Sequence, residues 1–152
     1  MCSSDLDDKP ERLKPLPERA RRAGASIITI AQQRGGPLWG DGRFDLVFLD
    51  VPCSGSGTWR RQPELKWRLT PERLNELQHI QDWLFADAAR HTAAGGKLIY
   101  ATCSILPCEN QDRVESFLAA HPAFRRTGAD FFASPASTQS DGFYAAFLTC
   151  EH

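Results

Sequence analysis

The fold is decided by residues 44–59, whose sequence is FDLVFLDVPCSGSGTW. The apolar run from Leu46 to Leu49 is short and lies between charged and turn-forming residues, a pattern typical of a buried strand in a parallel sheet. In open α/β sheets, the chemistry gathers where strands end at their carboxyl side. We therefore predict that Asp50 and Cys53 lie at a strand tip, on a loop whose small residues let a ligand come close.

A second strand delivers another cysteine in the same way. Residues 97–101 (KLIYA) form an apolar run that leads into Thr102, Cys103 and Ser104. Cysteine chemistry needs a thiolate, and a polar, partly exposed loop is where a lowered thiol pKa is easiest to arrange. Two cysteines at strand tips, with an acid beside one of them, therefore form a candidate catalytic group.

Length and charge describe an ordinary globular protein. At 152 residues the chain holds one domain at most. Its net charge is −1, so nucleic acid binding requires a local basic patch rather than a basic field over the whole surface. No stretch approaches the roughly 20 apolar residues of a membrane span, and the polar, acidic N-terminus does not resemble a signal peptide.

The five cysteines indicate a reducing compartment. Their number is odd and they are scattered, at positions 2, 53, 103, 108 and 150. This pattern is unlike a disulfide scaffold, so we predict a cytoplasmic protein. The sequence contains no CxxC pair and its four histidines show no ligand spacing, so we predict no metal site.

Strands and helices alternate along the chain. The expected strands cover residues 1–8, where the strand ends in acids, and residues 26–31, 46–49, 97–101 and 143–149. The expected helices cover residues 10–23, a longer segment from residue 71, and residues 109–120. The expected loops cover residues 32–43, 52–69 and 123–140, the last with room for one short strand. This alternation argues for a doubly wound α/β sheet.

The longest expected helix begins with strong capping signals. Thr70 is a good N-cap and Pro71 suits the first helical position. The inward stripe of this helix comprises Leu74, Leu77, Ile80, Leu84 and Ala88, and Gly95-Gly96 ends the connection to the next strand. Glu109 and Asn110 are expected to start the following helix, whose inward residues are Val114, Phe117 and Leu118.

The loop at residues 52–69 combines basic side chains with tryptophans. The basic residues are Arg60, Arg61, Lys66 and Arg68, and Trp59 and Trp67 lie among them. This combination suits phosphate contacts and base stacking, which favours RNA binding. The alternative interpretation is a solvated charged loop with two core tryptophans, and Asp50 has the alternative role of capping the loop that follows it.

Two motifs carry a resemblance to a known family. The sequences DVPCSG at residues 50–55 and ATCS at residues 101–104 resemble those of the Sun/Nol/Nop-type (RsmB-like) RNA cytosine-C5 methyltransferases. Similar stretches extend the resemblance over nearly the whole chain, at residues 57–61, 63–67, 106–110 and 141–144. The resemblance implies a Rossmann-like class I methyltransferase sheet, S-adenosylmethionine as the cofactor and RNA as the substrate, mainly ribosomal RNA in bacterial members.

The resemblance also implies a role for each matching residue. Cys103 corresponds to the nucleophile that attacks carbon 6 of cytosine, and Cys53 to the cysteine that assists release of the product. Asp50 corresponds to an acid between cofactor and base that contacts both. A carboxylate at the end of the first strand binds the cofactor ribose; helix spacing favours Asp7 for this role, whereas the Asp-Leu-Asp pattern favours Asp5. Ordinary helix N-terminal acids are the alternative for both.

Elementary chemistry agrees with these implied roles. Carbon 5 of cytosine is a poor nucleophile, and covalent catalysis by a thiolate splits one hard step into two easier ones. The base must also leave its stack to be reached, so the target is a single-stranded or extruded nucleotide.

The resemblance starts inside the family's catalytic domain. The glycine-rich cofactor loop and the first central strand are expected before residue 1, so residues 1–152 are expected to be a C-terminal part of that domain. Sheet edges exposed in such a part favour dimerisation. A non-catalytic module that binds RNA or a partner chain is the second hypothesis. A DNA cytosine methyltransferase with Cys53 as nucleophile is the third, and the Thr-Cys-Ser motif argues against it.

Overall fold

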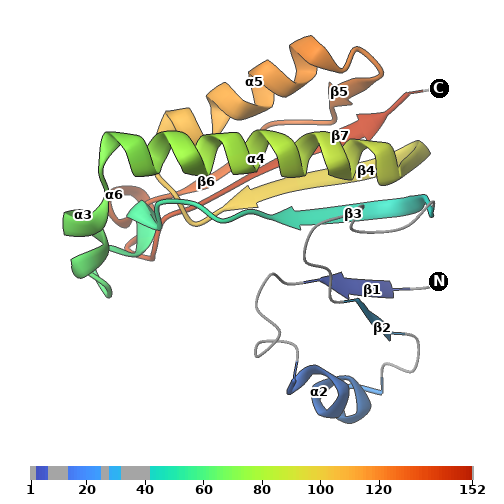
Figure 1. Ribbon diagram of the computed structural model, residues 1–152, viewed down its shortest axis with the longest axis horizontal. Helices are drawn as coiled ribbons and strands as arrows, with labels where there is room; N and C mark the ends of the chain where they lie inside the picture. The colour runs from blue at the N-terminus through green and yellow to red at the C-terminus, as the bar shows by residue number, and fades with distance from the viewer. Residues whose placement is uncertain (1–2, 7–13, 25–27, 32–41, 152) are drawn as a thin grey trace. The chain divides into compact units, whose positions relative to one another are not determined.

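The computed structural model describes residues 3–6, 14–24, 28–31 and 42–151 (Figure 1). The chain divides into two compact units, Met1–Gly42 and Arg43–His152.

The first unit contains one strand–helix–strand arrangement. Strand β1 (Ser3–Leu6) pairs in parallel with β2 (Ile28–Ala31), and α2 (Leu16–Arg22) lies between them in the chain. This order confirms the two strands and the helix that the sequence predicts here. The helix starts late because prolines surround its first residue, with Pro15 as N-cap and Pro17 in the first turn. Residues 10–13 of the predicted helix and most of the predicted loop 32–43 lie outside the described residues.

The second unit is built on a five-stranded sheet. Its strands are β3 (Phe44–Asp50), β4 (Thr92–Thr102), β5 (Phe124–Arg126), β6 (Phe131–Ala133) and β7 (Phe143–Cys150). The order is β3-β4-β7-β5, and β6 also pairs with β7. Strands β3 and β4 are parallel, whereas β7 is antiparallel to its neighbours. The parallel pair therefore points both cysteine loops toward the same edge of the sheet.

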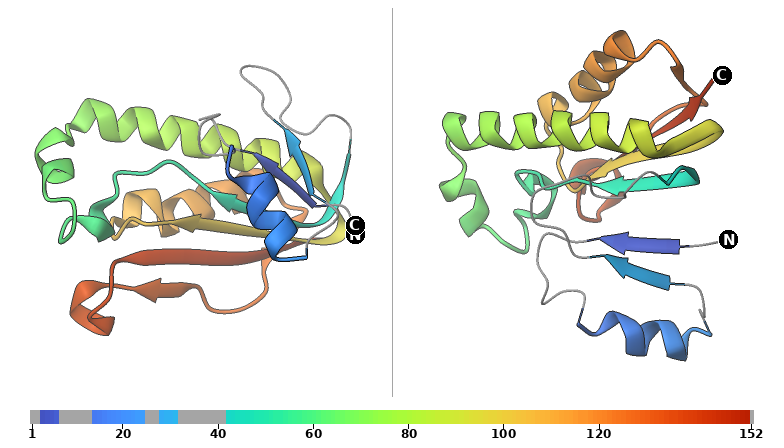
Figure 2. Two further views of the ribbon diagram at one scale, coloured as in Figure 1. Left: turned by 90° about the horizontal axis from the view of Figure 1, so that it is seen from below. Right: turned by 45° about the vertical axis from the view of Figure 1, so that its right-hand side comes forward.

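Two helices cover one face of this sheet. Helices α4 (Pro71–His91) and α5 (Gln111–Ala120) lie side by side over it (Figures 1 and 2). Between them and the sheet, the ring of Phe85 stacks on Tyr100 and Phe117 with centroid distances of 4.6 and 3.8 Å. All three rings belong to the buried core. Packing of this core holds the loops at the strand tips in place.

The expected strand at residues 46–49 is half buried rather than fully buried. Val47 faces the helices and is 6% exposed, whereas Leu46 and Phe48 are 56% and 58% exposed. The prediction of a strand is confirmed, but burial on both of its faces is wrong for the described residues. The reason is that α4 and α5 cover only the face to which Val47 points.

The capping signals of the longest helix are confirmed. The Thr70 side chain accepts a hydrogen bond from the backbone N–H of Arg73, and Pro71 is the first helical residue. Leu77 and Ala88 are buried as expected, but the inward position predicted for Ile80 is wrong, because this side chain is 39% exposed. The fully buried Gln81 turns inward instead. Its amide donates to the carbonyl of Pro52, a contact that no hydrophobic pattern predicts.

Short elements occupy two stretches that were predicted as loops. Residues 52–69 contain the 3-10 helix η1 (Ser56–Thr58) and helix α3 (Glu64–Arg68). Residues 123–140 contain β5, β6 and α6 (Pro135–Thr138). These elements are too short to show hydrophobic periodicity, and local capping such as that of Ser134 by Ser137 stabilises them.

Two predicted boundaries are also wrong. Strand β4 begins at Thr92, so Gly95 and Gly96 lie inside the strand, where the pairing with β3 shifts register. The helix expected from Glu109 begins at Gln111, after the 3-10 helix η2 (Pro107–Glu109).

Candidate active site

The two cysteines predicted at strand tips lie side by side. Cys53 follows β3 and Cys103 follows β4, and the register of these parallel strands sets Asp50 opposite Ala101. The two Sγ atoms are 3.4 Å apart, which is hydrogen-bond distance between sulfur atoms, and both cysteines are free thiols. Both side chains are half-buried, so the pair lies in a partly exposed setting.

The shared hydrogen bond makes the two thiols unequal. With the Cys53 thiol as donor, the bond stabilises a thiolate at Cys103 and lowers the pKa of Cys103 to about 7, although burial and the charge of Asp50 raise it. The same bond and burial both raise the pKa of Cys53. Two thiols that share a proton release their protons in separate steps. Near neutral pH, Cys103 is therefore the reactive thiolate and Cys53 remains a thiol.

Asp50 completes the group that the sequence predicts. It is the last residue of β3, and its side chain is exposed at the same edge of the sheet as the cysteines. Its negative charge raises the pKa of Cys103, as expected for an acid close to that sulfur. The carboxyl edge therefore carries a thiolate, a thiol and a carboxylate.

A buried acid that the sequence analysis did not select lies behind the cysteines. Glu109 is fully buried, and its carboxylate accepts hydrogen bonds from the backbone N–H and the hydroxyl of Ser54 and from the hydroxyl of Ser104. Asn110, also fully buried, donates from its side chain to the carbonyl of Ser104. The expectation that Glu109 and Asn110 merely start a helix is therefore incomplete. The available signal was the serine that follows each strand-tip cysteine, because buried serines need hydrogen-bond partners.

A glycine contact joins the cysteine loops to the turn before β7. The N–H of Gly57 donates to the carbonyl of Cys103 at 2.9 Å, and the N–H of Gly142 donates to the carbonyl of Gly57 at 2.8 Å. A Cβ atom at Gly57 would lie 2.5 Å from the carbonyl oxygen of Gly142 and 2.7 Å from that of Cys103. Only glycine fits this close approach of three backbone segments.

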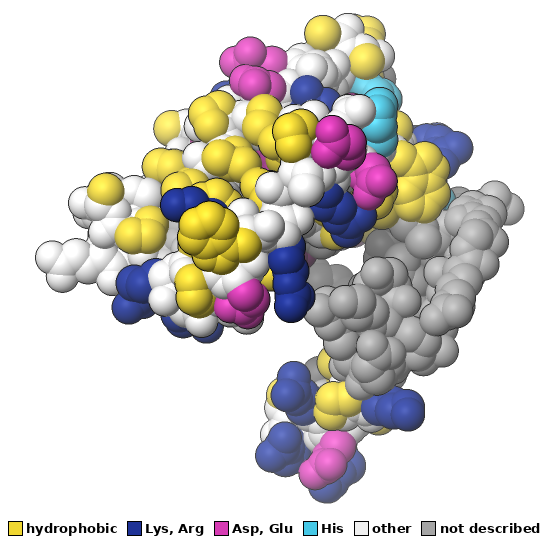
Figure 3. Space-filling model, turned by 60° about the vertical axis from the view of Figure 1, so that its left-hand side comes forward, with side chains coloured by type: hydrophobic (Ala, Val, Ile, Leu, Met, Phe, Trp, Pro, Cys, Tyr) yellow, Lys and Arg dark blue, Asp and Glu magenta, His cyan; other side chains and the backbone are white. Residues whose placement is uncertain are grey.

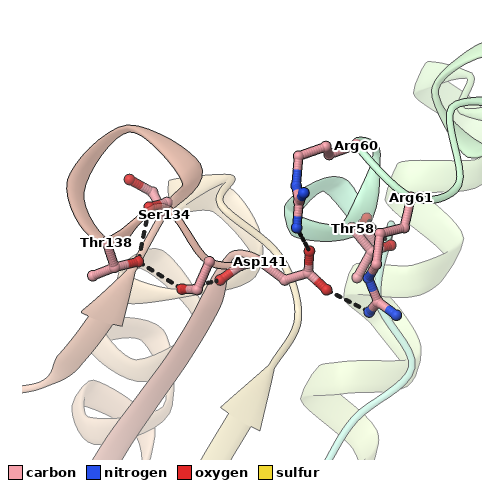
Figure 4. A network of polar contacts seen from close by, with 8 residues as sticks. Thr58, Arg60, Arg61, Ser134, Thr138 and Asp141 are labelled. Carbon is pink, nitrogen blue, oxygen red and sulfur yellow. Dashed lines mark hydrogen bonds and ion pairs between the residues drawn. The ribbon is translucent and has the colours of Figure 1, made fainter.

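The basic residues of the loop at 52–69 do not form one uniform patch. Arg60 and Arg61 both pair with Asp141, and Figure 4 shows this carboxylate facing both guanidinium groups. Lys66 and Arg68 lie on α3 with exposed side chains. On the visible face of Figure 3, Lys and Arg side chains are scattered among hydrophobic ones.

The two tryptophans of this loop differ in burial. Trp67 is 81% exposed, so the alternative of a core aromatic is wrong for it. Trp59 is half-buried. The ammonium group of Lys66 lies 6.0 Å from the ring centroid of Trp59 and 5.8 Å from that of Trp67, which is the distance of a weak cation–π contact.

The predicted ribose-binding acids lie at the margin of the described residues. Asp5 belongs to β1 and pairs with Ile30 in register, and only its backbone is described. Asp7 lies outside the described residues. Within the described ranges, no group of three His, Cys, Asp or Glu side chains is arranged to hold a metal ion, and no helix has the length and apolarity to cross a membrane.

The fold of this chain matches that of class I methyltransferases in solved structures. The crystal structure of NSun6 from Pyrococcus horikoshii with SFG matches this fold with a TM-score of 0.80 at 20% identity, over 98% of this chain and 41% of that chain. The crystal structure of PH0851 matches with a TM-score of 0.87 at 33% identity, over 98% of this chain and 36% of that chain.

Sequence comparison then identifies the family. The family described as 16S rRNA methyltransferase RsmB/F matches residues 4–149, and the chain belongs to this family. Ribosomal RNA small subunit methyltransferase B of Vibrio vulnificus (strain YJ016) is 35% identical, over 94% of this chain and 35% of that relative. The protein of the same name from Yersinia pseudotuberculosis (serotype O:1b, strain IP 31758) is 34% identical, over 93% and 34%. This chain spans about a third of the length of these relatives.

Proposed function

We propose that this chain carries the catalytic cysteines of an S-adenosylmethionine-dependent methyltransferase that acts on carbon 5 of cytosine in ribosomal RNA. The observation that carries the proposal is the 3.4 Å approach of the Cys53 and Cys103 sulfur atoms at the carboxyl edge of two parallel strands. The family and the names of the curated relatives support ribosomal RNA as the substrate. This substrate and the four free cysteines of the described residues support a cytoplasmic location.

Cys103 begins the proposed reaction. Its thiolate adds to carbon 6 of cytosine, which forms a C–S bond and moves an electron pair toward carbon 5 as the ring nitrogen gains a proton. Carbon 5 then accepts the methyl group that S-adenosylmethionine would supply, and S-adenosylhomocysteine would be the leaving group. Loss of the proton from carbon 5, cleavage of the C–S bond and return of the ring-nitrogen proton to solvent restore the neutral aromatic ring and the thiolate. The pKa of about 7 for Cys103 suits a nucleophile at neutral pH.

We expect Cys53 to accept the carbon 5 proton in the last step. In the free protein, the charge of Cys103 contributes to the raised pKa of Cys53. Once Cys103 is bonded to cytosine, it is a neutral thioether and that repulsion disappears. The pKa of Cys53 then falls, so its thiol releases its proton to solvent. The resulting thiolate is a base that is present only after the adduct has formed.

Carboxylates and basic side chains would bind the two substrates. The exposed carboxylate of Asp50 at the cysteine edge suits the amino group of cytosine and the amino and hydroxyl groups of the cofactor. Asp5 or Asp7 would hold the ribose. The exposed RNA-contact candidates are Arg60, Arg61, Lys66 and Arg68, with Trp67 available for stacking.

Separate replacement of the two cysteines tests the proposal. The full chain is incubated with S-adenosylmethionine and small-subunit ribosomal RNA, and protein–RNA adducts are resolved on a denaturing gel. We expect Cys53→Ala to accumulate a covalent adduct, because methylated cytosine is no longer released, and Cys103→Ala to form none. Cys150→Ala, a change at the far end of β7, is the control and should behave as the unchanged protein.

Other results of this experiment would favour one of the alternative hypotheses. An adduct that persists in Cys103→Ala and is lost in Cys53→Ala would assign the nucleophile to Cys53. No adduct in any variant, combined with tight RNA binding, would favour a non-catalytic RNA-binding module. Dimerisation through exposed sheet edges stays a prediction, and a monomeric mass by light scattering at high concentration would count against it.

A further inference from the structure

One buried carboxylate contacts both cysteine loops. A serine follows each of the two strand-tip cysteines, Ser54 after Cys53 and Ser104 after Cys103. The serine after each cysteine donates its hydroxyl to Glu109 Oε2, at 2.5 Å from Ser54 and 2.6 Å from Ser104. The backbone N–H of Ser54 also donates to Oε1 at 2.8 Å. A single side chain therefore fixes the residue next to each of the two reactive sulfur atoms.

The position of this carboxylate is itself determined by the core. The carboxylate accepts a fourth hydrogen bond at Oε1, at 3.1 Å from the side-chain amide of the fully buried Gln81 on α4. The Tyr100 hydroxyl on β4 donates to the backbone carbonyl of Glu109 at 2.7 Å. Asn110, the next residue, donates to the carbonyl of Ser104 at 2.9 Å. Glu109 is thus tied to α4, to β4 and to both loops.

Burial of this acid requires an explanation beyond stability. The side chain is 0% exposed, and among the described residues no Lys or Arg forms an ion pair with it. A buried charge without a counter-charge is costly, even when hydrogen bonds satisfy it. Hydrogen bonds to a carboxylate are, however, short and directional, which suits a residue that sets geometry.

We propose that Glu109 is a positioning residue that holds the two Cys-Ser dipeptides in register, so that the thiol of Cys53 donates to the sulfur of Cys103. The proposal deepens the proposed function and rests on it for the assignment of Cys103 as nucleophile. The positioning role can be tested without the reaction, because it concerns only the 3.4 Å contact between the two sulfur atoms.

The test measures the thiolate at Cys103 without any substrate. Cys103 in the full chain is alkylated with iodoacetamide between pH 5 and pH 10, and modification of the Cys103 peptide is followed by mass spectrometry. We expect Glu109→Gln to move the pH midpoint of alkylation upward by at least about 0.5 pH unit, because the Cys53 donor is no longer aligned. Glu115→Gln is the matched control, since Glu115 lies exposed on α5 and should leave the midpoint unchanged.

A second set of measurements, in a Cys53→Ala background, separates the alignment of the Cys53 donor from the effect of the Glu109 charge. The negative charge of Glu109 by itself raises the pKa of Cys103, so its removal alone would lower the midpoint. In a Cys53→Ala background there is no donor to align, and Glu109→Gln should cause no upward shift. A midpoint in Glu109→Gln equal to that of Glu115→Gln would overturn the proposal, as would an equal upward shift in both backgrounds.

Milder variants cover the case in which Glu109→Gln does not fold. Ser54→Ala and Ser104→Ala each remove one hydroxyl from the carboxylate, and circular dichroism checks that they fold. At least one should raise the midpoint, and no shift in either would overturn the proposal. Because alkylation needs neither RNA nor cofactor, this result does not depend on the adduct experiment. A shifted midpoint without any adduct would refute the proposed reaction and retain the positioning role.

Discussion

The two cysteine loops share a dipeptide and a location but differ in chemistry. Both loops follow parallel strands, and in both the serine after the cysteine donates a hydrogen bond to Glu109. The pKa of Cys103 is nevertheless lowered, whereas that of Cys53 is raised. The largest contribution in both cases comes from the same hydrogen bond, which raises the pKa of its donor and lowers that of its acceptor. Reactivity here is a property of the pair rather than of either cysteine sequence.

Removal of the donor should have the largest effect on this difference. Cys53→Ala takes away the hydrogen bond that lowers the pKa of Cys103, so this pKa should rise from about 7 toward or above the ordinary value of 9.0, because burial and Asp50 still raise it. The thiolate fraction at pH 7 should then fall by more than about tenfold. The pH profile of Cys103 alkylation measures the change.

A matched variant checks that the effect comes from Cys53. Cys150→Ala also removes one half-buried thiol, and should leave the Cys103 midpoint near pH 7. An unchanged midpoint in Cys53→Ala would show that the thiolate does not depend on the shared hydrogen bond.

The glycine contact between the loops should give an intermediate effect. In Gly57→Ala, the new methyl group would clash with backbone atoms of Gly142 and Cys103. These backbone atoms cannot rotate away as the end of a side chain could. We expect a loss of about 1–3 kcal/mol in the free energy of unfolding, measured by denaturant titration. Gly128→Ala is the control, because a Cβ there has no neighbour within 4 Å and the backbone is not in the positive-φ region. Equal stability of the two variants would mean that the loops are not tightly packed at Gly57.

The smallest effect is expected at the basic loop. Asp141→Asn removes the partner of Arg60 and Arg61, whose side chains are largely exposed, so stability should change by less than about 1 kcal/mol. If these arginines contact RNA, affinity should rise a few-fold and depend more steeply on salt. Fluorescence anisotropy with a small-subunit RNA fragment at two salt concentrations measures both. Weaker binding would instead mean that Asp141 orients the arginines for RNA.

The two strands that lead into the cysteine loops could be predicted from the sequence, but the buried polar contacts that hold these loops in place could not. Short apolar runs just before Cys53 and Cys103 predicted both strands, and the parallel register then brings the cysteines together. Thr70 and Pro71 predicted the start of α4 because capping depends on local residues.

The contacts of Glu109 and Gln81 could not be predicted in this way. The contacts of Glu109 with Ser54 and with Gln81 join segments 55 and 28 residues apart, and polar residues carry no periodic signal of burial. The short elements α3 and α6 were missed for a related reason, since each spans too few residues for a pattern to repeat.

The most direct test of the account identifies the residue bonded to RNA. The Cys53→Ala adduct with small-subunit ribosomal RNA is digested with nuclease and protease, and the nucleotide-bearing peptide is sequenced by mass spectrometry. The proposed mechanism predicts a methylated cytosine attached to the peptide that contains Cys103. A nucleotide attached to any other residue, or a reproducible absence of adduct alongside normal RNA binding, would contradict it.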